Sequence, residues 1–359
     1  MLNMNNRFLF AALFIVFISC TEDPSTTPLV LKGNRAVGYH ITNAADEDYE
    51  TAFQVALDAG MDVVPITLLL EDLFKDGEWH LELPQVIDLF YPANNMPVCL
   101  NLTPVAAVEK SLPDHLDYTF NDVEFHDLLM RAIDTIAYHT PNVQMDYFML
   151  GNEIDLYLNQ HPDEWDGYIA MYEKALLQVK KHWPEAKVGV ENTLSGYKGD
   201  ALEKIKQLNK NSDLIAFSYY PLDADFYMQD PSVLSQEFEF ITGLFPNRKL
   251  LLEETGYASG SLCGSSNQLQ NEFYQQFVKE WDQYAETIEF VGFLWLTDLP
   301  EAEADHFVDM YQMTGNVLAA PFKEFLRTTA LRTYANGGTE KPAFTTLKQE
   351  LKNRGWSVK

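Results

Sequence analysis

The sequence predicts an α/β protein folded as a (β/α)8 barrel, the TIM barrel, in a single domain. Eight apolar, strand-like runs alternate with helix-like segments along the chain. Such apolar runs between helices are typical of parallel strands that are buried on both faces of a sheet. No glycine-rich phosphate-binding motif follows an early strand, which disfavours an open nucleotide-binding sheet. With 359 residues, 47% of them hydrophobic, the chain has the length of a barrel with insertions.

Each expected strand is a run of six to eight mostly apolar residues bounded by a helical segment or a loop. In chain order the expected strands are residues 35–41, 61–68, 96–103, 144–150, 186–191, 213–220, 248–254 and 289–296. The expected helices repeat apolar residues at helical spacing. They are residues 46–59, 121–139, 163–183, 200–208, 233–244 and 268–285, with one or two more after Phe307. A longer connection that carries Trp79 and Tyr91 joins the second and third strands.

The N-terminus has the features of a targeting segment. Arg7 precedes an unbroken apolar run over residues 8–18. This run is about half the roughly 20 residues that a membrane-spanning helix needs, and it suits a signal peptide. Ser19-Cys20 follows directly and is similar to a bacterial lipobox, in which Cys20 would become the lipidated first residue. An ordinary secretory signal cleaved nearby is the alternative.

These observations divide the chain into three parts. Residues 1–19 are the expected lipoprotein signal peptide, residues 20–33 a lipid-anchored polar linker, and residues 34–359 the catalytic barrel with C-terminal helices. We therefore expect a lipid-anchored protein of the bacterial envelope.

Composition excludes several classes of partner. The formal net charge of −28 disfavours nucleic acid and anionic membrane surfaces. We expect contact with a membrane only through the lipid on Cys20. Besides Cys20 the chain has only Cys99 and Cys263, which make no disulfide framework, and no Cys or His shows metal-ligand spacing. We expect a monomer without metal or cofactor.

Two glutamates stand where expected strands end. Glu153 follows the run 144–150 and Glu254 ends the run 248–254. The carboxyl ends of the strands of a parallel barrel meet at one mouth, where barrel enzymes carry their active sites. Enzymes that cleave glycosidic bonds by double displacement need one carboxyl group as proton donor and another as nucleophile, about 5–5.5 Å apart. The two glutamates are candidates for this pair, whereas a separation near 9 Å would indicate inversion.

The motifs around these glutamates resemble those of a known group of enzymes. Gly151-Asn152-Glu153 and Glu254-Thr255-Gly256-Tyr257 resemble the catalytic motifs of clan A glycoside hydrolases, which are retaining (β/α)8 enzymes. Together with Ser218-Tyr219-Tyr220-Pro221 on the sixth strand, they are similar to the endo-β-1,4-galactanases of family 53. The resemblance covers strands four to eight. It is weak before them, because strands two and three lack the arginine and histidine residues of that family.

The resemblance implies a role for each motif residue. Glu153, after strand four, would be the acid/base, and Glu254, after strand seven, the nucleophile. Asn152 would hydrogen-bond the sugar 2-hydroxyl. Adjacent strand residues face opposite sides, so only one of Glu253 and Glu254 is expected to face the pocket, and Glu253 is the alternative nucleophile.

Other side chains are expected to bind the substrate or to support the nucleophile. Tyr220 would hold Glu254 by a hydrogen bond, with Tyr219 or a packing role as the alternatives. Trp295, at the end of strand eight, would stack against the sugar ring, unless it is a core residue. Further candidates for sugar contact end expected strands or lie close to such ends, with an ordinary loop role as the alternative. They are Tyr39, His40, Asn101, Asn192, Tyr257 and Asp298.

The function that follows is a retaining β-glycosidase. We expect endo-action on a neutral polysaccharide such as a β-galactan or a β-glucan, so that the partner is an oligosaccharide or polysaccharide. A transglycosidase would keep the same residues and exclude water. A non-catalytic glycan-binding surface lipoprotein on the same barrel is the alternative from another class.

Overall fold

The computed structural model describes residues 29–113 and 115–359. The expected signal peptide and the lipidation site at Cys20 lie outside these residues. None of the described helices combines the length and apolarity needed to cross a membrane.

The eight expected strands are present, and the fifth is interrupted at Val190. The barrel strands are β1 (Ala36–Tyr39), β2 (Val64–Leu69), β5 (Val98–Ala106), β7 (Met145–Asn152), β8 (Lys187–Gly189), β9 (Glu191–Thr193), β10 (Leu214–Tyr219), β11 (Lys249–Thr255) and β12 (Ile288–Phe293). Short insertions add the hairpin of β3 (Phe74–Lys75) and β4 (Glu78–Trp79), and β6 (Glu109–Lys110), which pairs with β5.

The barrel strands follow one another in chain order around the molecule. One parallel sheet runs β2-β5-β7-β8 and the other β9-β10-β11-β12-β1. At one junction the Asp213 amide donates to the Val188 carbonyl over 2.9 Å. At the other, the amides of Asp62 and Val63 donate to the Val37 carbonyl over 2.9 and 3.3 Å. These contacts connect the two sheets into a (β/α)8 barrel, which confirms the expected fold class.

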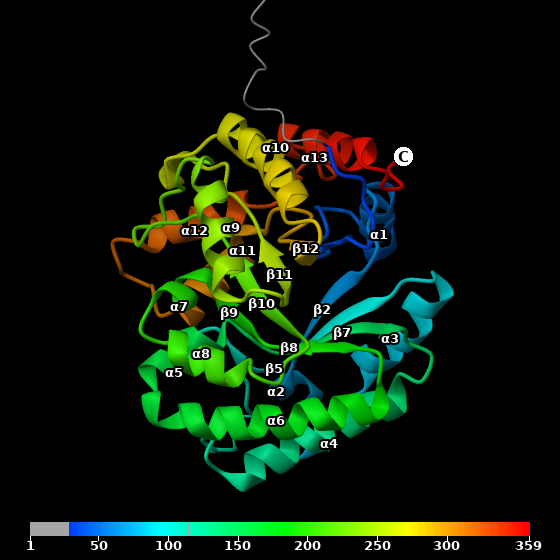
Figure 1. Ribbon diagram of the computed structural model, residues 1–359, viewed down its shortest axis with the longest axis vertical. Helices are drawn as coiled ribbons and strands as arrows, with labels where there is room; N and C mark the ends of the chain where they lie inside the picture. The colour runs from blue at the N-terminus through cyan, green and yellow to red at the C-terminus, as the bar shows by residue number, and fades with distance from the viewer. Residues whose placement is uncertain (1–28, 114) are drawn as a thin grey trace, which may run out of the picture.

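Helices surround these strands (Figure 1). The expected helices are α1 (Tyr49–Asp58), α4 (Val123–His139), α6 (Trp165–His182), α8 (Leu202–Leu208), α9 (Val233–Leu244) and α10 (Asn267–Gln283). Three helices follow β12: α11 (Glu301–Met310), α12 (Ala319–Thr328) and α13 (Pro342–Asn353). Four were not expected: α2 (Leu70–Leu73), α3 (Glu82–Ala93), α5 (Ile154–Gln160) and α7 (Leu194–Lys198).

Helix α3 replaces the irregular connection expected between strands two and three. Its buried residues Ile87 and Tyr91 are four positions apart, which is helical spacing. Pro84 lies in the first turn, where proline is tolerated, and Pro92 in the last, so neither breaks the helix. The two prolines argued against a helix in this segment, although its apolar residues recur at helical spacing.

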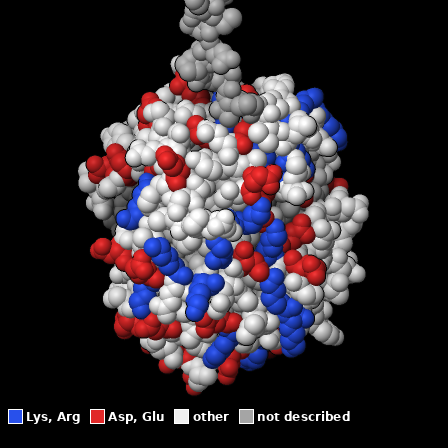
Figure 2. Space-filling model, viewed as in Figure 1, with Lys and Arg blue, Asp and Glu red and all other residues white. Residues whose placement is uncertain are grey.

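Charges of both signs are interspersed on the face shown in Figure 2. Basic side chains on that face lie beside acidic ones, in spite of the net charge of −28. This face therefore presents no extended surface of a single sign.

A buried ion network ties both ends of the described chain to α10. Asp282 accepts from Arg35, which precedes β1, over 2.9 Å, and from Arg354, which follows α13, over 2.8 Å. The Arg35 guanidinium also lies over the rings of Trp281 and Trp356, at 4.9 and 5.2 Å from their centroids. The network thus joins the first barrel strand to the last helix.

We expect Asp282→Ala to lower the free energy of unfolding by about 3–5 kcal/mol, because two buried arginines would lose their shared counter-charge. Urea denaturation measures this change. The control is Glu272→Ala on the exposed face of α10, for which a change within about 0.5 kcal/mol is expected. A loss below about 1 kcal/mol for Asp282→Ala would contradict the importance of the network.

Candidate active site

The barrel brings Glu153 and Glu254 to the same mouth. Glu153 directly follows β7, and Glu254 is the penultimate residue of β11. Both are half-buried. The Ser218 hydroxyl, at the end of β10, donates to Glu153 Oε1 over 2.5 Å, and Ser218 is the register partner of Glu254. Asn152, next to Glu153, donates from Nδ2 to Glu254 Oε1 over 3.3 Å. Ser218 and Asn152, which lie next to Glu153, are therefore also next to Glu254.

The backbone around Glu153 is held in an uncommon conformation. Gly151 has φ 101° and Glu153 has φ 45°, where the chain turns from β7 into α5. A Cβ on residue 151 would lie 2.6 Å from the Tyr168 hydroxyl, which donates to the Leu150 carbonyl over 2.6 Å. Only glycine fits there. Positive φ at a non-glycine residue is costly and is concentrated at functional sites, as found here at Glu153.

A bulge in β11 corrects one expectation. Phe217 pairs with Leu252, but the next residue, Ser218, pairs with Glu254, so Glu253 is the extra residue. Glu253 therefore faces the interior together with Glu254, and its Oε1 accepts from Asn101 Nδ2 over 2.9 Å. The expectation that only one of the two glutamates faces inward is wrong. Glu253 is only 2% exposed, whereas Glu254 is half-buried, so Glu254 is the more accessible of the two.

The two mouth carboxyls differ in their hydrogen bonds. Burial and then the charge of Glu254 raise the pKa of Glu153, the Ser218 hydroxyl lowers it, and the result is about 7. Burial also raises the pKa of Glu254 to about 7, against the donors Tyr220 and Asn152. The two groups titrate as a pair. Glu254 has two donors and Glu153 one, so the first proton leaves Glu254 and its charge keeps Glu153 protonated.

The sixth strand places its side chains as expected. Tyr220 follows β10, and its hydroxyl donates to Glu254 Oε2 over 2.8 Å. Ser218 shares this face of the strand. Tyr219 faces the opposite side, where its hydroxyl donates to Glu237 Oε2 over 2.6 Å. The expected contact between Tyr220 and Glu254 is thus present.

Trp295 lies just after β12 and is half-buried. A cis peptide bond joins it to Leu294. Its ring centroid is 6.0 Å from that of Phe307 on α11. The indole is therefore not enclosed in the core and retains exposed surface.

For Tyr220→Phe we expect kcat/KM to fall about tenfold to a hundredfold, because a hydrogen bond to a charged group is lost. Removing this donor raises the pKa of Glu254, so the acid limb of the pH profile should move to higher pH. A pH series of kcat/KM measures both effects. Tyr138→Phe, at an exposed position of α4, is the control. An unchanged acid limb would contradict the assigned role of the Tyr220 hydroxyl.

Two aromatic candidates do not reach the mouth. Tyr39 is fully buried, donates to the Ala59 carbonyl over 3.2 Å and packs against Phe293 and Phe344. Tyr257 is also fully buried and donates to the Gln229 carbonyl over 2.9 Å. The expectation that Tyr39 and Tyr257 contact the sugar is wrong, because both side chains pack between the strands and the helices.

Asn192 and Asp298 are also engaged elsewhere. Asn192 is fully buried and donates to the Val190 carbonyl over 3.3 Å, because on β9 its neighbour Glu191 faces the barrel interior. Asp298 is 8% exposed and forms a 2.7 Å ion pair with Lys341. The expectation that these side chains contact a sugar is wrong for this arrangement.

His40 and Asn101 lie inside the barrel around Glu253. His40 Nε2 is 3.0 Å from the Glu253 carbonyl oxygen, and burial lowers the pKa of His40 to about 4, so the ring is neutral. Asn101 donates to Glu253 and to the Gly151 carbonyl, and accepts from the Gly151 amide over 3.1 Å. Both side chains are buried and support the site from within the barrel. The expectation that they contact a sugar is therefore wrong for this arrangement.

Two residues near the site were not foreseen. Glu191 on β9 is fully buried, and its Oε2 accepts from Asn152 Nδ2 over 2.7 Å. The sequence signal that could have identified Glu191 is an acidic residue at the end of an apolar strand. Tyr311 follows α11; burial raises its pKa, and so do the charges of Glu153 and Glu254. No motif marks Tyr311, because it lies far along the chain in the C-terminal segment.

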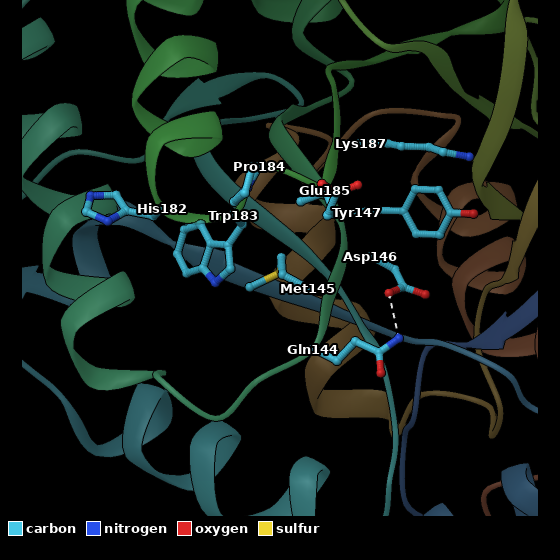
Figure 3. A pocket seen from close by; sticks show the side chains of 10 residues that line it. Gln144, Met145, Asp146, Tyr147, His182, Trp183, Pro184, Glu185 and Lys187 are labelled. Carbon is cyan, nitrogen blue, oxygen red and sulfur yellow. Dashed lines mark hydrogen bonds between the residues drawn. The ribbon is translucent and has the colours of Figure 1, made fainter.

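A cavity of about 500 Å³ lies at the opposite end of the barrel. Figure 3 shows the side chains that line it, among them Met145 and Tyr147 of β7, Trp183, and Lys187 of β8. These residues lie at or just before the starts of β7 and β8, whereas Glu153 and Glu254 come at strand ends. The cavity is therefore separate from the candidate active site. Among the residues that the structure describes, no group of His, Cys, Asp and Glu is arranged to hold a metal ion.

The comparisons identify the fold. No protein-family model matches the chain, and no curated protein matches its sequence. Three similar solved structures are GH5_18 from Streptomyces cattleya in complex with Manβ1-4GlcNAc, exo-β-1,4-mannosidase Op5Man5 from Opitutaceae bacterium strain TAV5, and the GH53 catalytic domain of Ignisphaera aggregans. Their TM-scores are 0.68, 0.69 and 0.61, at 15%, 13% and 13% identity.

These matches cover almost the whole barrel. The alignments span 89%, 90% and 90% of this chain, and 80%, 60% and 99% of the respective structures. The chain therefore has the (β/α)8 fold found in clan A glycoside hydrolases, and family 53 is among its structural neighbours.

Proposed function

We propose that this protein is a retaining glycoside hydrolase with Glu153 as acid/base and Glu254 as nucleophile. The observation that carries the proposal is the pair of half-buried carboxyl groups at the barrel mouth, with Ser218 donating to Glu153 and with Asn152 and Tyr220 donating to Glu254. The barrel fold shared with glycoside hydrolases supports it.

The geometry accounts for both steps of double displacement. Glu254, kept ionised by Tyr220 and Asn152, attacks the anomeric carbon while protonated Glu153 gives its proton to the leaving oxygen. In the second step the Glu153 carboxylate takes a proton from water while the water oxygen attacks the anomeric carbon, which breaks the bond to Glu254 and releases the sugar. The raised pKa of Glu153 suits a group that must alternate between acid and base near neutral pH.

The substrate we propose is a neutral β-linked oligosaccharide or polysaccharide. The motifs favour a β-galactan or a β-glucan, with endo-action. The neighbours add β-mannosides, since one is in complex with Manβ1-4GlcNAc and another is named an exo-β-1,4-mannosidase. The half-buried indole of Trp295 retains exposed surface that is available to stack on the apolar face of a pyranose.

The test is a panel of β-galactans, β-glucans, β-mannans and matching aryl β-glycosides, with product sizing and anomeric NMR. Initial formation of the β-anomer supports retention, and fragments of intermediate length support endo-action. Products with new linkages would support a transglycosidase. Glycan binding without turnover by the wild-type protein would overturn the proposal in favour of a binding protein.

We also propose that the protein is attached to the bacterial envelope through a lipid on Cys20. Cys20→Ser should abolish labelling with a palmitate analogue and move the protein from the membrane fraction to the soluble fraction. Cys263→Ser, a buried cysteine of the barrel domain, is the control and should remain in the membrane fraction. If Cys20→Ser fractionates like the wild type, the lipobox assignment is wrong.

A further inference from the structure

Two further glutamates lie inside the barrel beside the proposed nucleophile. Glu191 faces the barrel interior from β9, and Glu253 faces it from the bulge of β11. Their side chains are 0% and 2% exposed. Double displacement needs two carboxyl groups, so neither of these has a task in the reaction as derived above. Buried acidic residues are costly unless they are satisfied or neutral, and this raises the question of what they do.

Each inner glutamate accepts a hydrogen bond from one asparagine. Asn152 Nδ2 donates to Glu191 Oε2 over 2.7 Å, and Asn101 Nδ2 donates to Glu253 Oε1 over 2.9 Å. Glu191 Oε1 and Glu253 Oε2 are buried and receive no hydrogen bond from any residue that the structure describes. An ionised carboxylate offers about four acceptor sites, so one donor leaves most of the charge unsolvated.

Asn152 connects Glu191 to the mouth. The same Nδ2 that donates to Glu191 over 2.7 Å also lies 3.3 Å from Glu254 Oε1. An amide nitrogen carries two protons, so it can serve both carboxyl groups at once. The shorter of the two bonds goes to Glu191, which therefore sets how the Asn152 amide is rotated relative to Glu254.

Within the described part of the chain, no cation forms an ion pair with this cluster of four carboxyl groups. The buried cations among the described residues are paired with carboxylates elsewhere: Arg35 and Arg354 with Asp282, Arg332 with Glu47, and Lys341 with Asp298. No ion pair in residues 29–113 and 115–359 involves Glu153, Glu191, Glu253 or Glu254. Several negative charges at this site would repel one another in a poorly solvated interior.

The other titratable groups around the cluster add no positive charge. They are the neutral ring of His40, which follows β1, the thiol of Cys99 on β5, the buried carboxyl group of Asp155 on α5, and the phenols of Tyr197, Tyr220 and Tyr311. Burial raises the pKa of Glu191, and the charges of Glu253, Glu254 and Glu153 raise it further. Burial, and then the charge of Glu254, likewise raises the pKa of Glu253.

We propose that Glu191 is a positioning residue that acts as a neutral carboxylic acid, holding the Asn152 amide against Glu254 and leaving Glu254 the single negative charge of the cluster. Glu253, held by Asn101, is the second neutral acid. The cluster then has the charge that the first step requires, with Glu153 protonated and Glu254 ionised. This inference rests on the proposed function for its kinetic consequence, but not for the protonation state of Glu191.

The kinetic test compares two replacements of Glu191 of similar size. Glu191→Gln keeps an oxygen acceptor for Asn152 and is uncharged, so kcat and the pH profile should stay within about threefold of wild type. Glu191→Leu removes the acceptor, and kcat should fall about tenfold to a hundredfold with a smaller change in KM. Equal losses in both variants, or an acid limb that moves to lower pH in Glu191→Gln, would show that Glu191 carries a charge and would overturn the proposal.

The second test needs no activity. A buried neutral acid ionises on unfolding above pH of about 4.3, so it makes the unfolding equilibrium constant rise by about tenfold per pH unit. Glu191→Gln should remove this slope, and its stability relative to wild type should therefore increase from pH 5 to pH 8 in urea titrations. Glu239→Gln, at an exposed position of α9, is the control and should show no such increase. A constant difference between Glu191→Gln and wild type would overturn the neutral state.

Carbon-13 NMR decides the same point directly. In protein labelled at glutamate Cδ, the signal absent from Glu191→Gln assigns Glu191 in the wild type, and it should have the chemical shift of a protonated acid at pH 7. A carboxylate shift at pH 7 would refute the proposal. If no glycoside is turned over but this signal is that of an acid, the proposed function fails and the neutral state of Glu191 stands.

Discussion

Glu254→Ala should abolish turnover, with a fall in kcat of about 10⁴-fold or more on every glycoside, because no covalent glycosyl-enzyme can form without the nucleophile. The loss should be independent of the leaving group. Wild-type protein treated with a 2-deoxy-2-fluoro aryl glycoside should gain the mass of one sugar, located by peptide mapping on Glu254. Glu254→Ala should gain none.

The same labelling decides between the two neighbouring glutamates. Both face the interior because of the bulge, but Glu253 is buried, whereas Glu254 is half-buried and accepts a hydrogen bond from Tyr220. Glu253→Gln, which keeps an acceptor for Asn101, should still be labelled on Glu254. A label on residue 253 of the wild type, or turnover that persists in Glu254→Ala, would contradict the assignment.

Glu153→Ala should separate the two chemical steps. General acid–base catalysis contributes about 10²–10⁴-fold, so natural glycans should lose that much in kcat/KM. A dinitrophenyl glycoside needs little protonation of its leaving group, and its first step should remain fast. The second step should become slow, because no base activates water. A burst of dinitrophenol followed by a slow steady state, measured by stopped flow, is the expected result.

Azide provides the complementary result for Glu153→Ala. As a nucleophile that needs no general base, azide should restore turnover of the aryl glycoside and give a β-glycosyl azide. Glu254→Ala has no glycosyl-enzyme for azide to attack and should not give this product. Absence of azide rescue in Glu153→Ala, with equal losses on natural and activated substrates, would mean that Glu153 is not the acid/base.

Several parts of this picture could be predicted from the sequence. The eight apolar runs between helices located every barrel strand, and helix α9 has the expected bounds. Glu153 and Glu254 were identified because strand ends are marked by local motifs, and parallel strands bring those ends to one mouth. The inward face of the sixth strand also followed from its period of two, which separated Tyr220 from Tyr219.

The tertiary structure decided what local patterns cannot express. The bulge that turns Glu253 inward is defined by the pairing register of β11 with β10 and β12. The sequence of β11 alone does not predict this register. Tyr39 and Tyr257 were assigned to the mouth because they stand near strand ends, but the orientation of their side chains depends on the packing of the surrounding helices.

Glu191 and Tyr311 show the same limit for the site itself. Glu191 accepts a hydrogen bond from Asn152, a residue on another strand, and the charges of Glu153 and Glu254 raise the pKa of Tyr311, which lies in a segment that follows the last barrel strand. By itself the sequence determined the barrel, its order of strands and the two mouth glutamates, because those depend on hydrophobic period and on motifs at strand ends. Only the tertiary structure decided the hydrogen-bond partners and the charge balance of the site, because these depend on distances between residues far apart in the chain.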